Sequence, residues 1–219
     1  RRCGRLHQPH EGCVGHRHAV HRPGRGGTGP SVRLRRQGQL TGAGRGFGSS
    51  LFLFMIQIIQ NTTGALFSEE EQAQLIGFVD AQLLKPCPVW LGTFLTKCFY
   101  GNSYSKLSIA PLVERLAMLA PNQKFNTLFL QKYPVGSEVY PHRDPYNNID
   151  DTIILVLGEF TGATSKVDGV DYNVTRNSAI IMSCTKNNQR GPLHSVSPIE
   201  TGTRYAVILN TIKAKNDPT

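Results

Sequence analysis

The sequence predicts a mainly β protein with flanking helices, in which an antiparallel double-sheet sandwich or jelly roll follows two helices. Two apolar patterns with helical spacing occur first, between residues 68 and 119. After Asn122 the apolar spacing changes to that of short strands separated by turn residues. No helical pattern interrupts these strands, which favours antiparallel pairing. We therefore expect the two helices to buttress a sheet.

Residues 1–54 differ in composition from the rest. They hold ten Arg, no Lys and one acid, Glu11, so 10 − 1 = +9 accounts for the whole formal charge, and residues 55–219 are neutral. Such a Gly-, Arg- and His-rich segment lacks the apolar residues needed to order itself. It is either a basic nucleic-acid-binding arm or non-native sequence upstream of a true start at Met55. The second is favoured, because the residue types missing from it mostly have A/T-rich codons.

Residues 55–219 are long enough for one domain with its own core. The apolar run 51–59 is too short to cross a bilayer, so we expect no membrane association. Three cysteines without paired spacing (Cys87, Cys98 and Cys184) favour a reducing, cytoplasmic compartment. No obligate protein partner is indicated.

The first helix is predicted to start after Ser68, because Ser68 and Glu71 have the spacing of a capping box. Its inward residues are predicted to be Leu75, Ile76, Val79 and Leu83, before Pro86 and Pro88 end the pattern. The second helix is predicted from about Pro111 to Leu119, with Leu112, Val113, Leu116 and Leu119 facing inward.

Seven strands are predicted after Asn122, and Asp168-Gly169 is predicted to form a tight hairpin turn between the third and the fourth. The predicted ranges are 125–133, 152–157, 164–167, 170–174, 178–183, 194–198 and 204–212.

Two histidines and one aspartate indicate a metal site. His142 and Asp144 lie on the same side of an extended segment, because side chains alternate along a strand. His194 is the other histidine in residues 55–219, since five of the seven in the chain lie in the tail. Two His and one carboxylate form the ligand set of non-haem Fe(II) oxygenases.

Arg204 has a role in the same hypothesis. Oxygenases with this ligand set commonly use 2-oxoglutarate, whose far carboxylate lies inside the barrel and needs a cation. The planar guanidinium of arginine matches a carboxylate better than lysine does. Arg204 begins an apolar run, so we expect its side chain to point into the barrel.

Residues 125–137, followed by His142-Arg143-Asp144, resemble the core of AlkB-like Fe(II)/2-oxoglutarate-dependent dioxygenases. This resemblance covers roughly residues 88–212. It implies a double-stranded β-helix fold, iron held by His142, Asp144 and His194, and 2-oxoglutarate held by Tyr133 and Arg204. Two positions in the co-substrate region depart from the family: Gln131 stands where Asn is usual, and Asn210 stands where a second Arg is usual.

The resemblance further implies O2 as co-substrate and oxidative dealkylation of N-alkylated nucleobases, with alkylated single-stranded DNA or RNA as partner and a role in DNA/RNA repair. Tyr100, Tyr104 and Arg143 are then the candidate substrate residues. Two alternatives remain open: hydroxylation of a protein side chain (prolyl-hydroxylase-like) or of a nucleobase carbon, and a non-catalytic sandwich that only binds. Because residues 55–219 are neutral, phosphate binding would depend on local cations: Lys97, Lys106, Lys132 and Arg143.

Overall fold

Two α-helices, one 3-10 helix and three antiparallel sheets make up the fold of the residues that the structure describes. The computed structural model describes residues 56–59, 66–145, 147–185 and 190–213, so the predicted tail and Met55 lie outside the described residues. The helices are α1 (Glu69–Asp80), the 3-10 helix η1 (Gly101–Lys106) and α2 (Ala110–Ala117). The strands are β1 (Ile56–Ile59), β2 (Lys85–Pro86), β3 (Leu95–Tyr100), β4 (Thr127–Tyr133), β5 (Val139–His142), β6 (Asn148–Leu157), β7 (Phe160–Gly162), β8 (Ser165–Val167), β9 (Val170–Tyr172), β10 (Ser178–Ser183), β11 (His194–Val196), β12 (Ile199–Gly202) and β13 (Arg204–Ile212).

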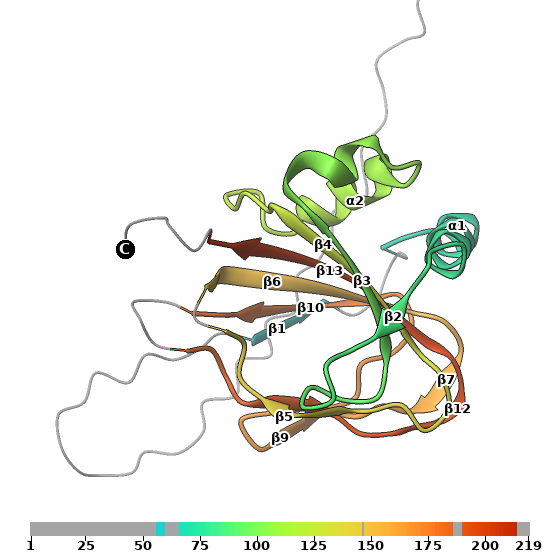
Figure 1. Ribbon diagram of the computed structural model, residues 1–219, viewed down its shortest axis with the longest axis vertical. Helices are drawn as coiled ribbons and strands as arrows, with labels where there is room; N and C mark the ends of the chain where they lie inside the picture. Colours follow the sequence, from blue (N-terminus) through green and yellow to red (C-terminus); the bar gives the residue numbers. More distant parts are fainter. Residues whose placement is uncertain (1–55, 60–65, 146, 186–189, 214–219) are drawn as a thin grey trace, which may run out of the picture. The chain divides into compact units, whose positions relative to one another are not determined.

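The sheets form two facing layers, with the helices outside one of them. The large sheet has the order β1-β10-β6-β13-β4-β3-β2, the small sheet β5-β11-β8-β9, and β12 pairs with β7. Helices α1 and α2 cover one face of the large sheet, and the small sheet lies against its other face (Figure 1). The expected mainly β jelly roll with two buttressing helices is therefore confirmed.

Alternation along β13 assigns its side chains to the two faces of the large sheet. Val207 and Leu209 pack against the helices in a cluster that includes Leu75. Ala206 faces the opposite way and packs with Val139 of the small sheet. Residues with even numbers in β13 therefore face the space between the sheets, because strand side chains alternate with a period of two.

Helix α1 begins as predicted and ends earlier. The backbone N–H of Glu71 donates to Ser68 Oγ at 3.2 Å, and that of Ser68 donates to Glu71 Oε2 at 2.8 Å, which confirms the capping box. The helix ends at Asp80, so Leu83 lies beyond it and is 80% exposed. The prediction that Leu83 faces inward was wrong, because the apolar spacing continues past the residue where the helix ends. Helix α2 agrees with its predicted range to within two residues.

The predicted strands agree best where both faces are buried. β10 and β13 have the predicted bounds, and the turn between β8 and β9 has positive φ at both Asp168 (46°) and Gly169 (84°), as a tight hairpin requires. The prediction that strands start only after Asn122 was wrong, since β1, β2 and β3 precede it. The side chains of β3 are only partly buried, so its apolar pattern is weak.

No helix in the described residues has the length and apolar character needed to span a bilayer. Cys87, Cys98 and Cys184 are all free thiols.

Candidate metal centre

The three predicted metal ligands converge at the end of the small sheet. His142 ends β5 and His194 begins β11, and the two residues are directly opposite in the antiparallel register. Asp144 Oδ1 lies 3.7 Å from His142 Nε2 and 3.9 Å from His194 Nε2. Both distances are shorter than twice a metal–ligand bond of about 2.1 Å. One ion can therefore contact the carboxylate together with either ring.

Backbone carbonyl groups orient both imidazoles. His142 Nδ1 lies 2.8 Å from the Tyr140 carbonyl oxygen, and His194 Nδ1 lies 3.1 Å from that of Pro192. A carbonyl only accepts hydrogen bonds, so each Nδ1 carries the proton and each Nε2 keeps its lone pair for a metal. Burial and the neighbouring His194 ring lower the pKa of His142, which favours the neutral form that binds metals.

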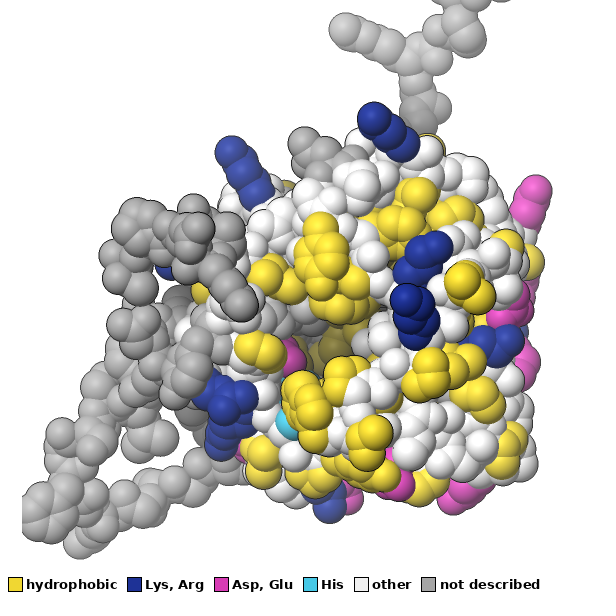
Figure 2. Space-filling model, viewed as in Figure 1, with side chains coloured by type: hydrophobic (Ala, Val, Ile, Leu, Met, Phe, Trp, Pro, Cys, Tyr) yellow, Lys and Arg dark blue, Asp and Glu magenta, His cyan; other side chains and the backbone are white. Residues whose placement is uncertain are grey.

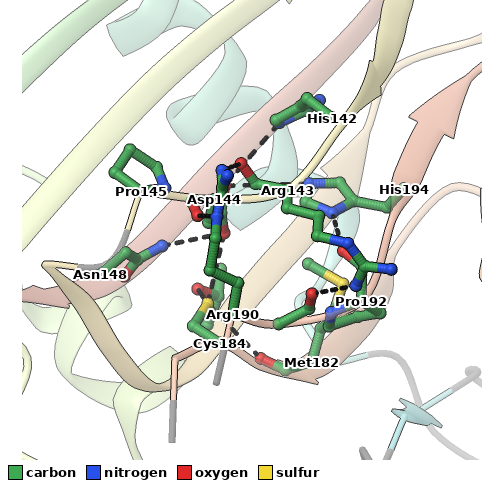
Figure 3. A network of polar contacts seen from close by, with 12 residues as sticks. His142, Arg143, Asp144, Pro145, Asn148, Met182, Cys184, Arg190, Pro192 and His194 are labelled. Atoms are coloured by element: carbon green, nitrogen blue, oxygen red, sulfur yellow. Dashed lines mark hydrogen bonds and ion pairs between the residues drawn. The ribbon is translucent and has the colours of Figure 1, made fainter. Parts of the chain in front are cut away.

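Two residues that sequence reasoning missed hold the carboxylate. Asp144 Oδ2 accepts hydrogen bonds from Asn148 Nδ2 at 2.9 Å and from the Cys184 thiol at 3.3 Å. Figure 3 shows these contacts on the side of Asp144 away from the histidines. They leave Oδ1 for a metal, and the His–Asp–His arrangement therefore has the supporting hydrogen bonds that metal sites usually show.

One face of the protein has a hollow whose rim is largely apolar. Figure 2 shows this hollow, with a histidine and an acidic side chain at its edge. Trp90 is 63% exposed, and its ring is edge-on to His142 with 6.4 Å between ring centroids. Tyr100 ends β3 and is 65% exposed. No sequence pattern identified Trp90, because its contact with His142 joins segments far apart in the chain.

Arg204 is a buried cation between the sheets. It is 3% exposed and pairs with Tyr133 in the register of β13 and β4. Its guanidinium carbon lies 4.9 Å from the centroid of the Tyr133 ring. Among the described residues, no carboxylate lies within ion-pair distance of Arg204. Burial lowers the pKa of Arg204 and raises that of Tyr133 to about 12.

Other polar side chains share this interior. The Tyr133 hydroxyl donates to Gln131 Oε1. Asn210 is 8% exposed and faces the interior by the alternation of β13, and its Oδ1 has no hydrogen-bond donor among the described residues. Thr96 Oγ1, opposite Gln131 in the register of β3 and β4, is also buried without a partner there. Buried polar atoms without partners are rare, and here they point to a polar ligand between the sheets.

Two of the predicted substrate residues have partners within the protein. The Tyr104 hydroxyl donates to the Phe125 carbonyl at 2.8 Å, and its ring packs against the cluster on the helix side of the large sheet. Arg143 Nη1 donates to the Gly191 carbonyl at 2.5 Å, and its guanidinium also lies near Asp168. Of the three predicted substrate residues, the structure leaves Tyr100 the most exposed.

The fold recurs in solved structures, although no protein-family model matches the sequence and no curated protein matches it significantly. A prolyl-4-hydroxylase from Pseudomonas putida superposes with a TM-score of 0.54 at 14% identity, covering 74% of this chain and 95% of that one. A prolyl hydroxylase from Trichoplax adhaerens, in complex with a hypoxia inducible factor peptide, gives 0.56 at 16% identity, covering 72% and 83%. An oxidoreductase of the 2OG-Fe(II) oxygenase family from Burkholderia pseudomallei gives 0.53 at 12% identity, covering 71% and 84%. The chain therefore has the jelly-roll fold of these proteins.

Proposed function

We propose that this protein is an Fe(II)- and 2-oxoglutarate-dependent dioxygenase. Two features together carry the proposal: a His–Asp–His cluster, and a buried Arg204 that has no carboxylate within ion-pair distance among the described residues. A metal ion held by these three side chains would keep coordination positions for a co-substrate and O2. Arg204 supplies the cation that a buried carboxylate requires.

The side chains present fit both a metal ion and 2-oxoglutarate. His142, Asp144 and His194 would hold the metal, and Arg204 with Tyr133 would hold the far carboxylate of 2-oxoglutarate. Bound there, Fe(II) and 2-oxoglutarate supply the oxidation of a substrate C–H bond by O2. The chain itself orients the imidazoles through backbone carbonyls, fixes the carboxylate through Asn148 and Cys184, and excludes water with the apolar walls around Ala206.

A protein side chain is the substrate class that the local charges favour. Three of the four cations considered for phosphate binding have partners of their own: Lys97 donates to Gln82, Lys132 pairs with Asp80, and Arg143 donates to Gly191. The Trp90 ring beside His142 is instead an exposed aromatic group. Nucleic-acid binding depends on cations that reach the phosphates, and these contacts hold three of the side chains against the protein, which weakens the case for it.

Dealkylation of a nucleobase is the second candidate, supported by the resemblance of residues 125–144 to AlkB-like dioxygenases. An exposed aromatic ring such as that of Tyr100 is suited to stacking on a base that has left its helix. The two candidates give different products: hydroxylation adds one oxygen to a peptide, whereas dealkylation releases an aldehyde and an unmodified base.

The test of the dioxygenase is succinate release from 2-oxoglutarate with added Fe(II). The wild-type protein should release succinate even without substrate, and Asp144→Ala should release none. Asp171→Ala is a matched control, because Asp171 is an exposed carboxylate that pairs with Lys166. Absence of Fe(II)-dependent turnover in the wild type would count against an enzyme. Turnover with proline-rich peptides or methylated single-stranded DNA, followed by mass spectrometry, then separates the two substrate classes.

A further inference from the structure

Asp144 lies beyond the part of the small sheet that strand pairing fixes. The ladder between β5 and β11 ends at the pair His142 and His194, and Asp144 follows in the segment after β5. The main chain at Asp144 therefore needs other contacts to hold its carboxylate beside the two rings. The hydrogen bonds of two arginines supply them.

Arg190 binds the segment that carries Asp144. Its Nε donates to the Asp144 carbonyl at 2.9 Å, and its Nη2 donates to the Arg143 carbonyl. One planar guanidinium thus spans two successive carbonyl groups, which the single ammonium of lysine is poorly shaped to do. Figure 3 shows Arg190 extending alongside Asp144.

Arg143 binds the main chain of the segment that carries Arg190 and leads to His194. Its Nη1 donates to the Gly191 carbonyl, three residues before His194 and next to Arg190. Its guanidinium also lies 3.8 Å from Asp168 Oδ1, which accepts from the Leu193 backbone N–H at 3.0 Å. Each arginine therefore binds the main chain of the segment that carries the other.

Gly191 keeps this junction close to the group that holds Asp144. A Cβ at Gly191 would lie 2.8 Å from the Ser183 carbonyl oxygen and 3.0 Å from Cys184 Cα. The main chain at Gly191 thus packs on the end of β10, beside the thiol that donates to Asp144 Oδ2. A displacement of Gly191 would move the supports of Asp144 as well.

We infer that Arg143 and Arg190 form a reciprocal clamp, defined by their hydrogen bonds to Gly191 and to residues 143–144, which positions Asp144 relative to His194 for metal binding. The inference rests on the metal site of the proposed function. It assigns both arginines a positioning role, and it gives Arg143 a task other than the substrate contact predicted from sequence.

The test measures metal affinity without turnover. Trp90 is the only tryptophan of the chain and lies beside His142, so quenching of its fluorescence reports Co²⁺ binding directly. Arg190→Gln and Arg143→Gln should each raise the Co²⁺ dissociation constant about 10-fold or more, as loss of supporting hydrogen bonds at metal sites typically does. Arg190→Lys should recover only part of the affinity. The double variant should lose less than the product of the two single effects, because both residues act in one network.

Arg176→Gln is the matched control. Arg176 also joins three side chains, Gln72, Glu69 and Glu159, but it lies away from the metal ligands. Its loss should lower the melting temperature without changing Co²⁺ affinity, which separates general destabilisation from the clamp.

Two results would overturn the inference in distinguishable ways. Unchanged Co²⁺ affinity and an unchanged Co²⁺ absorption spectrum in both Arg→Gln variants would refute the positioning role of the two arginines, while the metal site itself would stand. Failure of the wild-type protein to bind Co²⁺ would remove the metal site, and the proposed function with it. If Arg190→Gln does not fold, Arg143→Gln and Arg190→Lys test the same prediction.

Discussion

Replacing Arg204 by Met should make the ligand-free protein more stable and abolish its response to 2-oxoglutarate. Arg204 is buried with no carboxylate within ion-pair distance among the described residues, so its charge is desolvated without an ionic partner. The effective penalty for burying one ion is several kcal/mol. The contact with the Tyr133 ring offsets about 2 kcal/mol of it. Met has a similar length and no charge.

The desolvation penalty of Arg204 exceeds the contribution of the Tyr133 ring, which predicts a gain of about 1–3 kcal/mol in the free energy of unfolding of the ligand-free Met variant. With a urea dependence of about 2 kcal/mol per M, a gain of 2 kcal/mol raises the unfolding midpoint by about 1 M. Saturation with 2-oxoglutarate and Mn²⁺ at about 100 times the dissociation constant should stabilise the wild-type protein by about 2.7 kcal/mol. The Met variant should gain only what Mn²⁺ alone provides.

Urea unfolding with and without 2-oxoglutarate, at constant Mn²⁺, measures both effects. Arg204→Lys is the control, because it keeps the charge and loses the planar pair of donors, so it should retain weakened 2-oxoglutarate binding. A Met variant that is less stable than the wild type and is still stabilised by 2-oxoglutarate would refute the assignment of Arg204 as a carboxylate site.

Three further predictions concern Glu71 and the predicted substrate residues Tyr104 and Tyr100. Hydrogen bonds from Arg115, and then from the backbone N–H of Ser68, lower the pKa of Glu71 to about 2. The charged carboxylate therefore stabilises the fold fully above the unfolded-state pKa of about 4.3, and this stabilisation is lost as the pH falls toward 2. Glu71→Gln keeps the helix cap and should lower the free energy of unfolding at pH 7 by about 1 kcal/mol, because a partly exposed ion pair contributes no more than this. A stability difference between the variant and the wild type that stays constant from pH 7 to pH 2 would contradict this prediction. Tyr104→Phe removes the bond to the Phe125 carbonyl and should cost about 1 kcal/mol of stability with KM unchanged. Tyr100→Ala should raise KM for the substrate while changing stability by less than about 0.5 kcal/mol, and the reverse assignment of the two effects would show that Tyr104, rather than Tyr100, contacts substrate.

Local sequence patterns predicted the elements whose start, turn or extent is determined by residues within the element itself. The spacing of Ser68 and Glu71 predicted the start of α1, and Asp168-Gly169 predicted the turn between β8 and β9. β10 and β13 were predicted with their bounds, because their continuous apolar runs are buried on both faces. The end of α1 and the existence of β3 depend on neighbouring elements, and they were therefore missed.

The composition of residues 55–219 also determined the candidate metal ligands, since only two histidines are present there and both have a place in the ligand set. The position of Arg204 after His194 in the sequence predicted it as the residue that binds the far carboxylate of 2-oxoglutarate. The residues that support Asp144 were not predictable in this way. Asn148, Cys184 and Arg190 reach Asp144 through contacts that depend on how β5, β6, β10 and β11 pair.

The sequence by itself therefore determined the fold class and the chemistry available to the site: two imidazoles, a carboxylate and an arginine. Only the tertiary structure decided that the two imidazoles and the carboxylate come together, that Arg204 is buried without a carboxylate partner among the described residues, and that Arg143 binds the main chain of the segment leading to His194. The physical reason is that strand alternation is local and readable from the chain, whereas the distance between two side chains on different strands depends on register, and register is fixed by pairing between segments far apart in sequence.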